Sequence, residues 1–150
     1  MILEKGVFPN VRVNFLSLTC CHCAKPACID VCPGNAIQKR EEDGIVVVDR
    51  KKCWGRDACG GRCYDACPYG APQFGKEENA KMEKCDYCID RLYKGKTPIC
   101  VSCCPCRALD AGPLEELRRR YGDLQEAKGF VYHSEVKPSV IFRRKLGSSG

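Results

Sequence analysis

The alternation of apolar and polar residues predicts short strands in the first third of the chain. Residues 8–18 (FPNVRVNFLSL) alternate in part, which is typical of an extended arm or an edge strand. Residues 45–48 form a β-branched run, and the turn-forming pair Asp43-Gly44 comes directly before it. We therefore expect a short hairpin whose strands are residues 36–39 and 45–48.

A helix is predicted in residues 112–123 (GPLEELRRRYGD). Pro113 suits its first turn and Gly122 suits its end. Acidic residues near the start and arginines near the end complement the helix dipole. Three apolar residues share one face and predict a packing stripe: Leu114, Leu117 and Tyr121. The tail from residue 123 onward has little periodicity, and we expect it to lie over a neighbouring surface.

The composition points to a small domain organised by cysteine chemistry. The chain has 150 residues, enough for one compact domain or two very small ones, and 15 of them are cysteine. Such a density commonly serves disulfides, zinc sites or iron–sulfur clusters. The first residues (MILEKGVFPNVRVNFL) lack the features of a signal peptide, and no run approaches 18 apolar residues. We therefore expect a cytoplasmic chain, or one held at a membrane through partners, in which disulfides are not favoured.

The net charge of +6 does not by itself indicate nucleic-acid binding. Basic residues concentrate in KPSVIFRRK (residues 137–145) and LRRR (residues 117–120), without interleaved aromatic residues in one stripe. We expect these residues to form solvated surface or a docking face for a protein partner, and we expect no nucleic acid. The terminal GSSG resembles a linker or a cloning remnant, so the fold is considered without it.

Twelve of the cysteines form three groups, and each group ends in Cys-x3-Cys-Pro followed by an alanine four residues after the last cysteine. The first group is Cys20, Cys23, Cys28 and Cys32; the second is Cys53, Cys59, Cys63 and Cys67; the third is Cys85, Cys88, Cys100 and Cys104. Such recurrence indicates an internal repeat. Cys21, Cys103 and Cys106 are left over, and they are interpreted as small buried apolar residues or, alternatively, as redox-sensing thiols.

The Cys-x3-Cys-Pro ending is typical of a chain that serves two iron–sulfur clusters. Thiols two residues apart can curl around one cluster, and a thiol placed after a further short turn points toward another. Proline then ends the turn, because it has no N–H and disfavours a helical residue before it. We therefore predict that Cys28 holds one cluster, that Cys32 turns to a second, and that Pro33 ends the turn between them.

Other metal centres fit the sequence less well. A zinc ribbon needs two cysteine pairs but no Cys-x3-Cys-Pro extension, so a structural zinc-binding interaction module is kept as an alternative. A Rieske centre needs two histidine ligands, and His22 and His133 lie in no such motif. We expect His22 to face solvent, the alternative being a hydrogen bond near a sulfur, and we expect Trp54 to shield a cluster by packing.

With these motifs the sequence resembles the four-cluster, ferredoxin-like iron–sulfur (B) subunits of the dimethyl sulfoxide reductase and molybdopterin oxidoreductase family. The resemblance covers roughly residues 16–124 and is carried by LSLTCCHCAKPACIDVCPGNAI, DGIVVVD, ACPYGAPQF, KCDYCIDRLYKGKTPICVSCCP and RALDAGPLEELRRRYGDL. The third cysteine group with Pro105 is highly specific to such subunits. The resemblance implies an α+β fold of bacterial-ferredoxin-like cluster-binding repeats with short β-hairpins and short helices, plus a C-terminal helix and an extended tail.

The resemblance also implies ligand sets. One 4Fe–4S cluster would be held by Cys20, Cys23, Cys28 and Cys67. A second would be held by Cys32, Cys53, Cys59 and Cys63. A third would receive Cys85, Cys88 and Cys100, while Cys104 would reach a fourth.

Two departures from the family bear on these sets. The family's N-terminal cysteine motif is missing, so the chain is either truncated or has lost part of the outer cluster pair. We expect two complete clusters, and a third that is absent, incomplete, of the 3Fe–4S type, or completed by Cys103, Cys106 or a partner chain. The second group is also four residues longer than the family's spacing, which puts Cys53 in question as a ligand; Gly55, Gly60 and Gly61 would let this loop bulge.

The expected organisation is an N-terminal arm (1–15), a two-cluster ferredoxin-like domain (16–76), a partial second ferredoxin-like domain (77–112), and a C-terminal helix and tail (113–150). The expected function is electron transfer without substrate chemistry of its own. The resemblance implies a molybdenum- or tungsten-pterin catalytic subunit as partner, and often an integral membrane anchor. An iron–sulfur carrier of a hydrogenase or a formate-oxidising complex is the related alternative.

Overall fold

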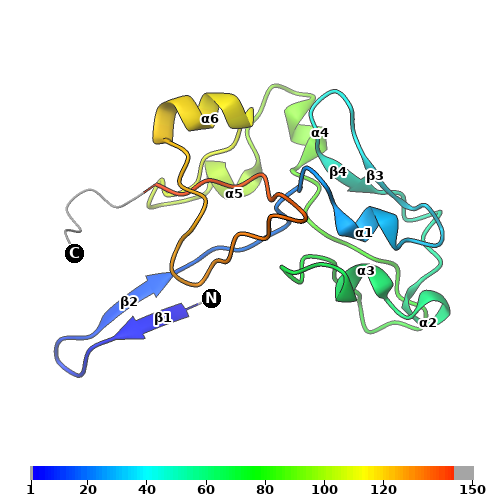
Figure 1. The fold of residues 1–150 in the computed structure, drawn as a ribbon, viewed down its shortest axis with the longest axis horizontal. Coiled ribbons are helices and arrows are strands. Elements are labelled where there is room, and N and C mark those ends of the chain that lie inside the picture. The colour runs from blue at the N-terminus through cyan, green and yellow to red at the C-terminus, as the bar shows by residue number, and fades with distance from the viewer. Residues whose placement is uncertain (1, 144–150) are drawn as a thin grey trace.

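The computed structural model describes residues 2–143, and short helices and hairpins make up its α+β fold (Figure 1). In chain order the elements are β1 (Ile2–Lys5), β2 (Arg12–Phe15), α1 (Ala27–Asp30), β3 (Ile37–Lys39), β4 (Val46–Val48), α2 (Arg56–Cys59), α3 (Arg62–Asp65), α4 (Ile89–Leu92), α5 (Ile99–Ser102) and α6 (Leu114–Tyr121). This architecture confirms the expected fold class. No helix in residues 2–143 has the length and apolar character needed to cross a membrane. The terminal GSSG lies outside the described residues.

The central hairpin forms where the β-branched run and the turn signal predict it. Strands β3 and β4 pair antiparallel, with Ile37 opposite Val48, and each is one residue shorter than expected. The carboxylate of Asp43 accepts a hydrogen bond from the N–H of Ile45 at 2.9 Å, and Gly44 has a φ of 71°. The Asp-Gly pair therefore makes the turn, as the sequence indicates.

A second hairpin lies at the N-terminus and projects from the rest of the molecule (Figure 1). The strand expected within residues 8–18 is present as β2, and it pairs antiparallel with β1, which the alternation pattern did not predict. Large apolar side chains of this hairpin are exposed, including Phe8 at 91% and Phe15 at 77%. The hairpin is thus an extended arm with no packing partner among the described residues for these two rings.

One backbone motif occurs three times, at the end of each cysteine group. Helices α1, α3 and α5 are single turns in which the second residue is a cysteine, and the last cysteine of the group follows two residues after the helix ends. Proline comes next. The third residue after the last cysteine adopts a positive φ, and its N–H donates to the carbonyl of that cysteine. These residues are Asn35 (φ 46°, to Cys32), Gly70 (φ 58°, to Cys67) and Arg107 (φ 47°, to Cys104).

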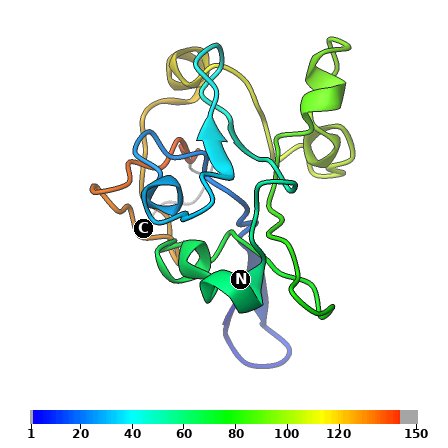
Figure 2. The same cartoon turned by 90° about the vertical axis from the view of Figure 1, so that its right-hand side faces the viewer.

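The buried core is small, and cysteines are part of it. Helix α1 packs against both α3 and β3. The buried cluster between these elements consists of Ala36, Ile37, Val46, Cys53, Cys63 and Met82. Figure 2 shows α4 and α5 set to one side of α1 and α3. The first two cysteine groups therefore share this core, whereas the third group lies apart from it.

The C-terminal part consists of α6 and a tail that returns to the first cysteine loop. Gly122 ends α6 as expected, but Pro113 is the capping residue before the helix instead of a residue of its first turn. The tail runs beside the first cysteine loop: the N–H of Ala24 donates to the carbonyl of Lys137 at 2.8 Å, and the N–H of Ser139 donates to that of Cys21 at 3.0 Å. The tail thus lies over a neighbouring surface, as expected.

Replacing Met82 should destabilise the fold strongly. Its side chain is 1% exposed at the centre of the core, so Met82→Ala would leave a cavity and cost about 2–5 kcal/mol of unfolding free energy. We expect a lower Tm in anaerobic thermal unfolding at a fixed scan rate. Val11→Ala, on the exposed arm, is the control and should change stability by no more than about 0.5 kcal/mol. Equal effects of the two substitutions would contradict this account of the core.

Candidate functional site

Eight of the twelve grouped cysteines line two hollows in the part of the molecule built from α1, α3 and the central hairpin. The first hollow encloses about 390 Å³, part of it open to solvent, and its grouped cysteines are Cys20, Cys23, Cys28 and Cys67. The second hollow encloses about 360 Å³, also partly open, and its cysteines are Cys32, Cys53, Cys59 and Cys63. The structure thus brings together the two sets of four thiols that the sequence resemblance implies.

Helices α1 and α3 exchange thiols between the two hollows. Cys28 lies within α1 and lines the first hollow, whereas Cys32 follows the helix and lines the second. The arrangement is reversed at α3, where Cys63 lines the second hollow and Cys67 the first. The spacing predicts this separation of Cys28 from Cys32. That the thiols bind iron stays a prediction.

The grouped thiols of the first hollow are crowded and half-buried. Burial raises the pKa of Cys28 to about 12, and the neighbouring Cys20 and Cys67 act in the same direction. Burial likewise raises the pKa of Cys23 to about 11, again with contributions from Cys20 and Cys67. In the second hollow, burial and then Cys59 and Cys32 raise the pKa of Cys63 to about 11. Adjacent thiolates therefore need a bound cationic group to offset their charge, as metal binding to cysteine provides.

The turn after the last cysteine of a group supplies a backbone N–H donor to the sulfur of that cysteine in two of the three repeats. The N–H of Ala36 donates to Sγ of Cys32 at 3.4 Å, and the N–H of Ala108 donates to Sγ of Cys104 at 3.3 Å. At Cys104 this N–H is the main cause of a lowered pKa, and Cys104 is at the surface. Backbone N–H groups aimed at cysteine sulfur are among the means by which proteins tune iron–sulfur clusters.

The lengthened second loop still delivers Cys53 to the second hollow. The extra residues form α2, and the flanking glycines Gly55, Gly60 and Gly61 have φ values of 93°, 70° and 69°. The loop is fastened at both of its first residues: Lys81 donates to the carbonyl of Cys53 at 2.8 Å, and Asn79 donates to that of Trp54 at 2.9 Å. Glycine is therefore required where the backbone turns, as expected.

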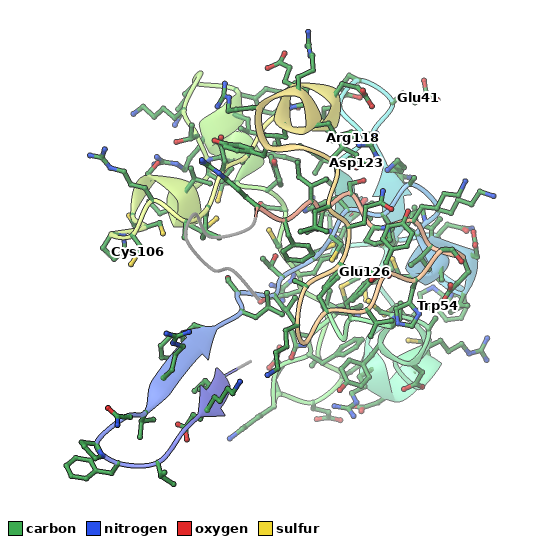
Figure 3. The ribbon with its side chains drawn as sticks, turned by 60° about the vertical axis from the view of Figure 1, so that its left-hand side comes forward. Glu41, Trp54, Cys106, Arg118, Asp123 and Glu126 are labelled. Carbon is green, nitrogen blue, oxygen red and sulfur yellow. The ribbon has the colours of Figure 1, made fainter. Side chains whose placement is uncertain are left out.

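Trp54 is one of the residues that line the second hollow, and Figure 3 shows it at the periphery of the molecule. Its side chain lines the hollow, and the residue is 53% exposed. Because about half of the residue is exposed, the expected shielding is partial.

The third cysteine group lines neither hollow. Tyr87 lies between Cys85 and Cys88 in the sequence, and its N–H donates to Sγ of Cys85 at 3.4 Å. Cys100, Cys103 and Cys106 are exposed, and Figure 3 shows Cys106 at the periphery of the molecule. The expectation that the spare cysteines are small buried residues is correct for Cys21, which is 5% exposed, and wrong for Cys103 and Cys106.

The donor sets fit an iron–sulfur cluster better than zinc. Within residues 2–143, no group of three or more His, Cys, Asp or Glu side chains is arranged to hold a single metal ion. Zinc draws its thiolates to about 2.3 Å from one ion, so its ligands lie close together. Here the thiols surround hollows, and the four grouped cysteines at each hollow match the ligand number of a 4Fe–4S cluster, while Cys21 is a fifth cysteine at the first hollow.

His22 is buried, contrary to the expectation that it faces solvent. It is 7% exposed, its Nδ1 accepts the N–H of Val46 at 3.0 Å, and its ring meets Tyr87 edge-on at 5.3 Å. Burial lowers the pKa of His22 to about 4, so the ring is neutral near pH 7. The ring fills the space between β4 and the third cysteine group, and the local sequence gives no signal of that contact.

Known proteins are similar to this chain. A family model described as a 4Fe-4S dicluster domain matches residues 11–114. The chain is 48% identical over 146 residues to the B subunit of the anaerobic dimethyl sulfoxide reductase of Escherichia coli (strain K12), which covers 97% of this chain and 68% of that protein. It is 42% identical over 111 residues to perchlorate reductase subunit beta of Dechloromonas aromatica, covering 74% of this chain and 32% of that one. Selenate reductase subunit beta of Thauera selenatis is 46% identical over 100 residues, which cover 67% of this chain and 29% of that protein.

Gly55 should tolerate substitution less well than Gly60. A Cβ at Gly55 would overlap the side chain and backbone of Asn79, whereas nothing lies within 4 Å of a Cβ at Gly60. Gly60→Ala should cost about 1–2 kcal/mol from its left-handed backbone alone. Gly55→Ala should lower the anaerobic Tm further and weaken iron retention at the second hollow. Equal Tm values for the two variants would contradict the described packing of this loop.

His22→Phe should destabilise the protein although it keeps an aromatic ring in place. The substitution removes the acceptor of the Val46 N–H, and a buried unpaired N–H costs on the order of 1–3 kcal/mol. We expect a lower Tm and faster hydrogen exchange at the Val46 amide. His133→Phe is the control, because His133 pairs with Glu135 at an exposed site and should leave the Val46 amide unchanged. Unaltered exchange in His22→Phe would contradict the assigned hydrogen bond.

Proposed function

Because this chain belongs to the 4Fe-4S dicluster family and is an electron-transfer iron–sulfur subunit of the dimethyl sulfoxide, perchlorate and selenate reductase type, we propose that it relays electrons through two 4Fe–4S clusters, one in each hollow. The first cluster would be held by Cys20, Cys23, Cys28 and Cys67. The second would be held by Cys32, Cys53, Cys59 and Cys63. The observation that carries this proposal is the exchange of thiols between the hollows by α1 and α3.

The residues of the chain hold the clusters and set their properties. When bound, each cluster takes up and releases one electron at a time. The thiolates anchor it, the apolar walls restrict access of water, and backbone donors such as the Ala36 N–H stabilise charge on sulfur. The two sites adjoin through α1 and α3, so clusters held there would be neighbours that could exchange an electron. We propose no substrate chemistry for this chain itself.

The third cysteine group is the second part of the proposal. Cys85, Cys88 and Cys100 would contribute to a further cluster and Cys104 to another, each completed by ligands from elsewhere or left as an incomplete or three-iron centre. The exposure of Cys100 supports this assignment, because an exposed thiol is accessible to a second protein segment.

We propose a molybdenum- or tungsten-pterin catalytic subunit as the redox partner, with an integral membrane anchor as a further partner. The support is that the relatives are named as the B or beta subunits of dimethyl sulfoxide, perchlorate and selenate reductases. The terminal substrate and the direction of electron flow would then be set by that partner. Copurification of the chain with its neighbours under anaerobic conditions tests this assignment.

Cys28→Ser and Cys32→Ser should each damage a different cluster. Anaerobically prepared wild-type protein should contain about eight iron and eight sulfide in the two hollows, since each cluster holds four of each. Each substitution should remove or convert one cluster to a three-iron centre, seen in electron paramagnetic resonance (EPR) spectra, and the two variants should lose different signals. Cys103→Ser is the control, because Cys103 is exposed and lines neither hollow.

A colourless protein that holds zinc would overturn the proposed function. Loss of one and the same signal in Cys28→Ser and Cys32→Ser would overturn the assignment of two separate hollows. Iron above eight per chain that disappears in Cys85→Ser would belong to the third group.

A further inference from the structure

A lysine side chain lies at the wall of the first hollow, and two backbone carbonyls hold its ammonium group. Lys84 lines this hollow together with its cysteines. Its Nζ donates one hydrogen bond to the carbonyl of Val46 in β4 and another to the carbonyl of Cys85 at 2.9 Å. The positive charge is therefore held between the first hollow and the start of the third cysteine group, and it cannot swing freely into solvent.

The charge of Lys84 acts on the thiols of the first hollow. Burial and the thiols of Cys20 and Cys67 raise the pKa of Cys28, and Lys84 acts in the opposite direction by favouring the thiolate. The adjacent His22 is neutral near pH 7, because burial and then the charges of Lys84 and Lys39 lower its pKa to about 4. Lys84 is thus a cation close enough to act on a thiol of the first hollow, and the neutral His22 adds no second positive charge there.

A second lysine near this hollow has a different role in the packing. Lys39 donates to the carbonyls of Cys23 at 2.8 Å and Gly44 at 2.9 Å, which ties the first cysteine loop to the turn of the central hairpin. Lys39 is not among the residues that line the first hollow. At the second hollow, Lys81 donates to the carbonyl of Cys53 without lining the hollow, and the basic residue that lines it is Arg62.

We propose that Lys84 is a positioning residue that raises the reduction potential of the cluster in the first hollow. Reduction adds one negative charge to a cluster without changing its ligands. A fixed positive charge at the wall of a partly buried site stabilises the reduced form more than the oxidised form, since the effective dielectric constant there is lower than in water. This inference rests on the proposed function, because it requires a cluster in the first hollow.

The test is an EPR-monitored redox titration of the anaerobic, iron-loaded protein. The signal of the first cluster is identified as the one that Cys28→Ser removes, and the second cluster serves as an internal reference. Lys84→Met and Lys84→Gln should both shift the midpoint potential of the first cluster to a more negative value. Lys84→Arg should keep it near the wild-type value. Lys5→Met, which removes the same charge from the projecting arm, should leave both potentials unchanged.

Unchanged potentials in Lys84→Met and Lys84→Gln, with wild-type iron content, would overturn the inference and leave the proposed function intact. Loss of iron in both neutral variants would also overturn it, because Lys84 would then be needed to hold the site together. Equal shifts in both clusters would overturn its restriction to the first hollow. Wild-type protein without iron would instead refute the proposed function, so the two failures are distinguishable.

Discussion

The structure depends on a constraint of charge and space: eight of the grouped thiols converge on two adjacent hollows. Burial and mutual repulsion disfavour their ionised forms, as the raised pKa of Cys28 and of Cys63 shows. A bound iron–sulfur core would ease this conflict, since its positive charge would offset part of the thiolate charge and the core would fill the space between the thiols. The short helices, the hairpin and the tail are arranged so that the thiols can meet in this way.

One local motif, used repeatedly, satisfies this constraint. In α1 and α3, a single helical turn carries a cysteine that lines one hollow, and the last cysteine of the group, two residues after the helix, lines the other. A residue with positive φ then turns the chain after that last cysteine. Where α1 and α3 pack together, this makes each hollow depend on both helices. The consequence is a core in which Cys53 and Cys63 take the place of apolar side chains, beside Val46 and Met82.

Charges around the sites are arranged by the same few segments. Lys84 joins β4 to the third cysteine group, and His22 accepts a hydrogen bond from that strand on the other side of Val46. The hairpin is therefore more than a packing element, because it positions both a cation and a neutral ring between two cysteine groups. Such contacts set cluster potentials without altering the ligands themselves.

The sequence by itself determined the cysteine repeat, the central hairpin, α6 and the separation of Cys28 from Cys32, because each depends on residues close together in the chain. Only the tertiary structure decided that Cys53 reaches the second hollow through its longer loop, that His22 is buried, and that β1 pairs with β2. The boundaries of the expected domains stay a prediction. Local spacing fixes the direction of a side chain relative to its own turn, whereas burial depends on which distant segment packs against it.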